Sequence, residues 1–190
     1  VLMQTITVKE LMVPVAEYAT VSDEATLHDA VLALEEAQKR VEGDREKHRA
    51  VLVLDKKGRV IGKLDQWTVL WAIEPRYKLI GNLRDTSRYG FSPDFLRSMI
   101  DSYGLWRKPL EGICRKAAVM KVKDIMHTPG EGEFVGADAS LDTAIHQLVM
   151  GHHQSLLVTR GDDVVGVLRL SDVFKKICDT IKACEAGSAQ

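Results

Sequence analysis

The chain lacks an excess of either charge, since its 26 lysine and arginine residues are balanced by 27 acidic residues among 190. This balance gives no electrostatic reason to bind nucleic acid or an anionic membrane surface. The chain also lacks apolar runs near the roughly 20 residues that a membrane-spanning helix needs. Its first residues have neither the charged region nor the apolar region of a signal peptide. We therefore expect no nucleic-acid partner and no membrane partner.

Cysteine is scarce, and no two cysteines form a C-x-x-C pair. The three residues are Cys114, Cys178 and Cys184. An odd number of widely spaced thiols is typical of a reducing compartment, so we predict a cytoplasmic protein. The histidines also give no metal site, because His146, His152 and His153 lack the i, i+4 helical spacing and have no completing carboxylate.

Recognisable catalytic motifs are absent as well. The sequence contains no G-x-S-x-G elbow, no nucleophile–base arrangement and no paired carboxylates in a familiar setting. The glycines of residues 130–136 are misplaced for a dinucleotide fingerprint, and they precede a strand instead of opening a helix. The basic residues between 107 and 123 have only Trp106 as a neighbouring aromatic, which indicates a solvated face. We predict that the protein is not an enzyme.

What the chain does contain is an internal duplication. The segment Val8 to Met12 (V-K-E-L-M) returns as Val122 to Met126 (V-K-D-I-M), and residues 62–64 (G-K-L) match residues 166–168 (G-V-L). The first copy is longer because it contains the charged residues 38–47, which we expect to extend a helix or form a solvated loop. Two similar units that pack together also leave clefts between them.

The hydrophobic period changes in the same order in both copies. The elements expected in the first copy are a strand at 18–21, a helix at 27–37, hairpin strands at 50–54 and 60–64, and a helix from Asp65. Those expected in the second copy are a strand at 134–135, a helix from Ser140, hairpin strands at 156–159 and 164–168, and a helix at 173–181. Each copy is therefore predicted to fold as β-α-β-β-α. Thr26 with Asp29 is expected to form a capping box at the first helix.

Between the copies, the sequence predicts a helical hairpin docked on the module. Ser92 and Pro93 mark the start of one helix, and Lys108 with Pro109 starts another. The expected units are repeat one at 1–75, the insert at 76–120, repeat two at 121–184 and a tail at 185–190. A single copy of about 55 residues buries too little surface to be stable alone. We therefore predict an α/β protein of the α+β type in which both repeats share one module.

This tandem order, opened in each copy by V-K-[DE]-[LI]-M, resembles a pair of CBS domains, the arrangement called a Bateman module. In the second copy the resemblance extends over residues 137–141 (A-D-A-S-L) and 166–173 (G-V-L-R-L-S-D-V). It implies clefts that hold an adenosine nucleotide, with AMP, ADP or ATP as the ligand and no required cofactor. It also implies a homodimer and a regulatory role towards an effector protein that the sequence does not identify.

The nucleotide motif of the family has a glycine, then a hydroxyl residue, then an aspartate that holds the ribose. In the second copy the glycine is Gly166 and the aspartate is Asp172, while Arg169 stands at the hydroxyl position. Arginine can bind a phosphate bidentately, so the change alters the ligand expectation without removing it. The first copy has Asp65 and Thr68 at these two positions, and an aspartate would repel phosphate. We therefore expect one competent cleft, organised by repeat two.

Other candidates for this cleft have structural alternatives. Phe134, Val135 and Leu156 are candidates to line an adenine pocket, but strand residues of this kind also form a core. Thr128 is a candidate ligand contact or a turn residue, and His153 is a candidate at the cleft edge. Asp172 would also be favoured in the first turn of a helix without a ligand. The alternative function is a protein-interaction module whose nucleotide clefts have degenerated.

Overall fold

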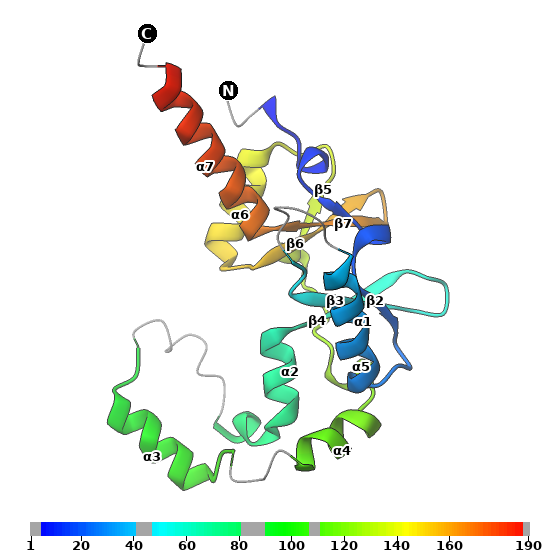
Figure 1. The fold of residues 1–190 in the computed structure, drawn as a ribbon, viewed down its shortest axis with the longest axis vertical. Helices are drawn as coiled ribbons and strands as arrows, with labels where there is room; N and C mark the ends of the chain where they lie inside the picture. The colour runs from blue at the N-terminus through cyan, green and yellow to red at the C-terminus, as the bar shows by residue number, and fades with distance from the viewer. Residues whose placement is uncertain (1–4, 41–46, 81–89, 107–110, 188–190) are drawn as a thin grey trace.

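The computed structural model describes residues 5–40, 47–80, 90–106 and 111–187. The helices and strands of the first copy are β2 (Thr20–Ser22), α1 (Leu27–Lys39), β3 (Ala50–Leu54), β4 (Val60–Asp65) and α2 (Gln66–Ile73). Those of the second copy are β5 (Phe134–Gly136), α6 (Leu141–Gly151), β6 (Ser155–Arg160), β7 (Asp163–Arg169) and α7 (Leu170–Gly187). The predicted order and the α+β class are confirmed (Figure 1).

Each copy forms its own small sheet with the same pairing. In the first copy β2 runs parallel to β3, and β3 is antiparallel to β4. In the second copy β5 is parallel to β6, and β6 is antiparallel to β7. The second sheet gains a fourth strand, β1 (Val13–Pro14), which comes from the first copy and pairs antiparallel with β7.

The opening segment of each copy packs on the other copy. The 3-10 helix η2 (Val8–Glu10) hydrogen-bonds to the second copy, where the amide of Val8 donates to the carbonyl of Ala139 over 2.9 Å. The short helix α5 (Val122–Ile125) returns the exchange, since the amide of Val122 donates to the carbonyl of Ala25 over 2.8 Å. The repeated V-K-[DE]-[LI]-M motif therefore links the copies.

The buried side chains follow this exchange. One apolar cluster joins Ile6 and Val8 to the interior beneath α6, and a second joins Val122 to the interior beneath α1. A third cluster fills the space between the two sheets, with Leu52 of β3 against Leu157 of β6. Because each core needs residues from both copies, the two repeats form one module, as expected from their small size.

The predicted helix starts are mostly confirmed. Thr26 and Asp29 form the capping box of α1, and the Asp65 carboxylate accepts a hydrogen bond from the amide of Thr68 at the start of α2. Ser140 precedes α6 as predicted, but its hydroxyl contacts Thr143 Oγ1 at 3.0 Å instead of a helix amide. Of the charged stretch 38–47, α1 includes residues up to Lys39, while 41–46 lie outside the described residues.

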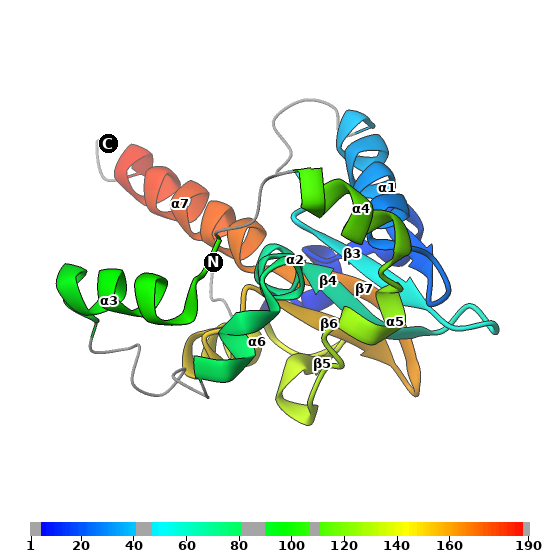
Figure 2. The ribbon, with the colours of Figure 1, turned by 90° about the horizontal axis from the view of Figure 1, so that it is seen from below.

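The prediction of a docked helical hairpin between the copies is only half right. Helix α4 (Glu111–Val119) packs against α1 and α2, whereas most of α3 (Pro93–Tyr103) extends away from both (Figures 1 and 2). Helix α3 has its predicted caps, Ser92 and Gly104, and its apolar residues Phe95 and Ile100 are exposed. The predicted helix start at Lys108 and Pro109 lies outside the described residues.

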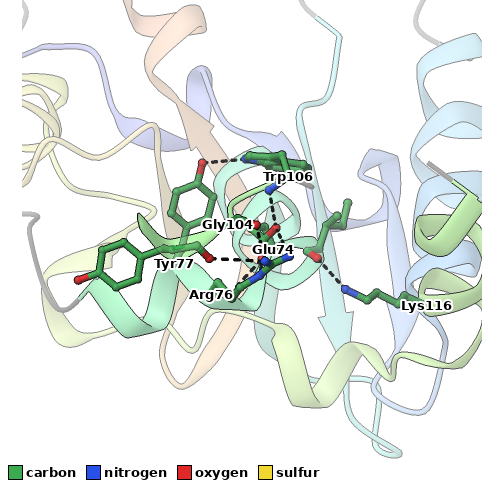
Figure 3. Close-up of polar contacts among 8 residues, drawn as sticks. Glu74, Arg76, Tyr77, Gly104, Trp106 and Lys116 are labelled. Carbon is green, nitrogen blue, oxygen red and sulfur yellow. Dashed lines mark hydrogen bonds and ion pairs between the residues drawn. The ribbon is translucent and has the colours of Figure 1, made fainter. Parts of the chain in front are cut away.

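A polar cluster anchors the C-terminal end of α3 to α2 (Figure 3). Glu74 is buried, and its carboxylate accepts hydrogen bonds from Arg76 Nε at 2.9 Å and from the amide of Trp106 at 2.8 Å. Arg76 also donates to the carbonyl of Gly104, and the Trp106 indole donates to the Tyr77 hydroxyl over 2.9 Å. Burial would raise the pKa of Glu74, but these hydrogen bonds outweigh burial and lower it.

The described part of the chain contains no helix that is both long enough and apolar enough to cross a membrane.

Candidate functional site

A cleft with a volume of about 1010 Å³ lies between the opening segment of the first copy and the junction of β7 with α7. Its walls come from both copies, because the opening segment crosses over to pair with β7. The first copy contributes Glu10 to Pro14, Ala16, Glu17, Tyr18, Ala37, Arg40 and His48. The second copy contributes Arg169, Asp172, Lys175, Lys176 and Asp179.

Gly166 allows the backbones of the two copies to approach closely at this cleft. Pro14 of β1 lies opposite Gly166 in the register with β7. A Cβ atom on Gly166 would lie 2.7 Å from Met12 Sδ and 2.8 Å from the carbonyl oxygen of Val13. Glycine is therefore needed because the opening segment occupies the space of a side chain.

Arg169 and Asp172 form a bidentate ion pair on the cleft wall. Arg169 is the last residue of β7, and Asp172 lies in the first turn of α7. Arg169 Nε donates to Asp172 Oδ2 over 2.5 Å, and Nη2 donates to Oδ1 over 2.7 Å. The two side chains are only 10% and 16% exposed, so the pair is shielded from solvent and bonds more strongly than an exposed one.

Two aromatic rings from the first copy lie beside this ion pair. The rings of Tyr18 and His48 have centroids 4.4 Å apart, and both residues are buried. Burial raises the pKa of Tyr18 to about 12, while Arg169 acts to lower it and Asp172 acts to raise it. Burial also lowers the pKa of His48, with Arg169 acting in the same direction, which favours the neutral imidazole. No described atom forms a hydrogen bond with His48 Nδ1, although this atom is buried.

The charges of the cleft are mixed. Arg40, Arg169, Lys175 and Lys176 supply positive charge, and four acidic residues lie among the same lining. Lys175 and Lys176 lie on α7, the helix that carries Asp172. A ligand held by Asp172 would therefore meet positive charge from the same helix. This combination of a carboxylate and nearby positive charges suits a ligand that carries an uncharged polar group beside an anionic group.

The matching place in the other copy contains a buried ion pair of its own. Lys63 corresponds to Val167 in the duplication, and it forms an isolated β-bridge with His127. Lys63 Nζ lies 2.7 Å from Glu133 Oε2, and His127 Nε2 lies 2.5 Å from Glu133 Oε1. Burial alone would raise the pKa of Glu133, but the hydrogen bonds from Lys63 and His127 outweigh it and lower the pKa to about 2.

The structure brings together some of the predicted site residues and separates others. Arg169 and Asp172 line the cleft, and Gly166 shapes its wall. Thr128 is exposed and follows His127, on the side of the Lys63–Glu133 pair.

The remaining four predicted residues lie outside this cleft. Val135 and Leu156 belong to the apolar core of the second copy, and Phe134 packs between the sheets. The His153 ring lies beside Gly132 and Gly151. Val135, Leu156 and Phe134 therefore pack in the interior, and His153 lies beside the end of α6.

Sequence reasoning missed the contribution of the first copy to this cleft. Tyr18, His48 and the segment around Met12 were not among the candidates, because hydrophobic periodicity does not show which copy an opening segment packs on. One signal was available, since His48 and His153 occupy matching positions just before the two hairpins. Among the described residues, no three metal-binding side chains gather in one place.

Comparison with known proteins identifies the class of this arrangement. The family model described as "CBS domain" matches residues 8–75 and 122–179, which is more than half of the chain. The chain therefore belongs to the CBS domain family and contains two CBS repeats in tandem. No curated protein matches the sequence.

Solved structures with the same fold include three that are informative. A CBS domain-containing protein from Bacillus anthracis matches with a TM-score of 0.61 and 17% identity, over 93% of this chain and 96% of that one. CBSX2 in complex with AMP matches with a TM-score of 0.57 and 18% identity, over 91% and 97% of the two chains. The CBS domain of a bacterial CNNM/CorC family Mg²⁺ transporter in complex with ATP matches with 0.57 and 16%, over 93% and 89%. At these identities the likeness shows the fold alone.

Proposed function

We propose that the protein is a regulatory module that binds an adenosine nucleotide in the cleft lined by Tyr18, His48, Arg169 and Asp172. The observation that carries the proposal is the position of Asp172 and Arg169 on the wall of a cleft of about 1010 Å³, a volume ample for a nucleotide. The carboxylate of Asp172 suits a ribose diol, and the fork of Arg169 suits a phosphate. Two proteins of the same fold are complexes with AMP and ATP.

The matching place in the first copy is proposed not to bind nucleotide. Lys63 stands at the position of Val167, and its charge is already paired with Glu133. Asp65, at the position where the family has a hydroxyl residue that contacts phosphate, caps α2 instead. A phosphate brought to Asp65 would be repelled. This asymmetry supports one nucleotide for each chain, bound at the end of β7.

A regulatory module needs two conformations, and the nucleotide must bind one of them more tightly than the other. We propose that the chain forms a homodimer and passes its signal to an effector protein. Exposed apolar side chains on α7, including Phe174 at 65% and Ile181 at 57% exposure, support an interface on this helix.

Isothermal titration calorimetry with AMP, ADP, ATP, S-adenosylmethionine and NAD tests the proposal. We expect saturable binding of at least one adenine nucleotide to the wild type, at one site for each chain. Asp172→Ala is expected to weaken this binding at least about 30-fold, because a charge-assisted hydrogen bond contributes about 2 kcal/mol.

The matched control is Asp162→Ala, which removes an exposed carboxylate from the turn between β6 and β7. This variant should bind as the wild type does. If Asp172→Ala binds as tightly as the wild type, or if no adenine compound binds, the site assignment is wrong.

A second candidate function is protein interaction through the insert. Helix α3 presents Phe95, Leu96 and Ile100 at 45–46% exposure, although it is capped at both ends and anchored by Glu74. This function would be favoured if the protein bound no nucleotide and formed a stable complex with another protein through α3.

A further inference from the structure

Helix α3 is held to the module at its C-terminal end. Arg76 donates to the carbonyl of Gly104 there, and the amide of Trp106 donates to Glu74 Oε2 over 2.8 Å. Among the described elements, no helix or strand packs along the length of α3, most of which extends away from the two sheets (Figure 1). Because an isolated helix of 11 residues is only marginally stable in water, α3 needs a further surface to pack against.

One side of α3 is apolar and exposed. Its large exposed apolar side chains recur at helical spacing, with exposed fractions of 39–46%, and form the α3 stripe: Phe95, Leu96, Ile100 and Tyr103. The charged residues of the helix lie on the opposite side, namely Asp94, Arg97 and Asp101. A helix with this pattern normally buries its apolar side, so the pattern indicates a partner outside the described part of the chain.

Helix α7 has an exposed apolar side of its own. The α7 stripe consists of Leu170, Phe174 and Ile181, at 37%, 65% and 57% exposure. These residues lie four and seven positions apart, so they fall on one side of the helix, and Cys178 lies on the same side. Helices α7 and α3 lie at opposite ends of the longest axis of the chain (Figure 1), so the two stripes can meet only between copies.

The area of the two stripes is sufficient for a stable dimer. A large apolar side chain that is about half exposed offers roughly 80–100 Å² to a partner. In a two-fold dimer each copy gives α3 to the α7 of its partner and receives one in return, so two equal contacts form. With four such side chains on α3 and three on α7 in each copy, the two contacts bury about 1,200 Å², which is the lower limit for a stable interface.

The charges of the two helices distinguish the possible pairings. Helix α3 (Pro93–Tyr103) has two acidic residues and one arginine, so its net charge is −1. The part of α7 that carries the stripe, residues 170–182, has three lysines and two acidic residues, so its net charge is +1. Opposite charges favour the packing of α3 on α7 over the packing of α3 on α3 or of α7 on α7.

We propose that two copies of this chain form a dimer in which α3 of each copy packs on α7 of the other. The inference rests on the homodimer proposed above and names the surfaces that meet. Helix α3 lies outside the two matched CBS regions, so it acts as an added arm that reaches the partner. Because α7 also carries Asp172 in its first turn, the arm contacts a helix that lines the cleft of the partner.

Sedimentation equilibrium on the full chain measures the dimer. The wild type is expected to be dimeric, and Ile100→Ser and Phe174→Ser should each raise the dissociation constant at least about 30-fold, because each change affects both contacts. Leu32→Ser is the matched control, since Leu32 is 50% exposed on α1, away from both stripes, and this variant should leave the constant unchanged (Figure 1). Circular dichroism checks that each variant is folded.

Cross-linking identifies the helices that meet. Leu96→Cys introduces a thiol into the exposed stripe of α3, and a short bismaleimide should join it to Cys178 of a second copy. The product should have twice the mass of the chain, and mass spectrometry of its tryptic peptides should show one peptide from α3 and one from α7. The wild type has no cysteine in α3, so it should give no such product.

The outcomes separate the arm from the proposed homodimer. If the wild type is dimeric but Ile100→Ser or Phe174→Ser leaves the dissociation constant unchanged, the arm is wrong and the homodimer stands. The same conclusion follows if the cross-link joins α3 to α3 or does not reach Cys178. If the wild type is monomeric at the highest concentration reached, the homodimer and the arm are both wrong. Nucleotide binding is measured separately by calorimetry, so neither result decides it.

Discussion

Lys63 and Glu133 form an ion pair of 2.7 Å that joins the last strand of the first copy to the 3-10 helix η6 (Glu131–Glu133), which directly precedes the first strand of the second. Both side chains are about one-tenth exposed, at 9% and 10%. The pair sits where the duplication places Val167 in the other half of the module, so one copy has a charged contact where the other has an apolar one.

Removal of one partner of this pair should destabilise the protein. Glu133→Ala leaves the Lys63 ammonium buried without its carboxylate, and we expect the free energy of unfolding to fall by about 3 kcal/mol. The double variant Lys63→Val with Glu133→Ala removes both charges and should recover most of this loss. Urea denaturation followed by circular dichroism measures both values. Equal losses in the single and double variants would contradict the assignment.

The ion pair of Lys63 and Glu133 should also make the stability of the fold depend on pH. The pKa of Glu133 falls from an ordinary value of 4.5 to about 2 in the folded protein. The carboxylate therefore stabilises the fold fully above pH 4.5, and this contribution is lost as the pH falls towards 2. A shift of this size corresponds to about 3 kcal/mol.

The measurement is the urea midpoint at a series of pH values between 6 and 2.5. The double variant without the ion pair should lose less stability over this range than the wild type. Identical pH profiles would show that Glu133 is not the group responsible.

The sequence was sufficient to predict the elements of each copy, but not which copy each opening segment contacts. Leu27, Ala30 and Leu34 show the helical period of α1 directly, because this period is a pattern among residues that are close together in the sequence. The contact between Val13 and Val167 depends on the exchange of segments between the copies, and local pattern does not encode it. For this reason Arg169 and Asp172 were predicted for the cleft, while Tyr18 and His48 were missed.

Ionisation of Tyr18 should report on the cleft. Burial raises its pKa to about 12 in the folded protein, so the neutral phenol stabilises the fold. This contribution is complete below pH 10 and is lost as the pH rises through 12. We expect the difference in ultraviolet absorbance between the wild type and Tyr18→Phe to show a tyrosine that ionises near pH 12. Ionisation near pH 10 would mean that Tyr18 is accessible to solvent.

The close approach at Gly166 gives a prediction about packing. Gly166→Ala places a methyl group 2.7 Å from Met12 Sδ and 2.8 Å from the Val13 carbonyl, so the opening segment must move. We expect a loss of about 1–3 kcal/mol in the free energy of unfolding, as for other overpacked sites. The control is Gly136→Ala, because a Cβ on Gly136 meets no atom within 4 Å. If Gly166→Ala left the free energy of unfolding unchanged, β1 would not pack closely against β7 at this position.

Glu74 should determine how firmly the insert is held. Its carboxylate is the acceptor for the amide of Trp106, and Arg76 bridges it to the carbonyl of Gly104 (Figure 3). Glu74→Ala removes a buried charged acceptor, and such hydrogen bonds contribute about 1.5–3 kcal/mol. The amide of Trp106 should therefore exchange with deuterium about 10–100-fold faster, while amides of β6 keep their rates.

Glu24→Ala is the control for this change, since Glu24 pairs with Lys123 at 2.7 Å but is 52% exposed. An exposed ion pair contributes little, so this variant should leave exchange at Trp106 unchanged. If Glu74→Ala also leaves it unchanged, the carboxylate does not anchor the insert. If exchange rises in β6 as well, Glu74 stabilises the whole module, and α3 is then not an independently attached arm.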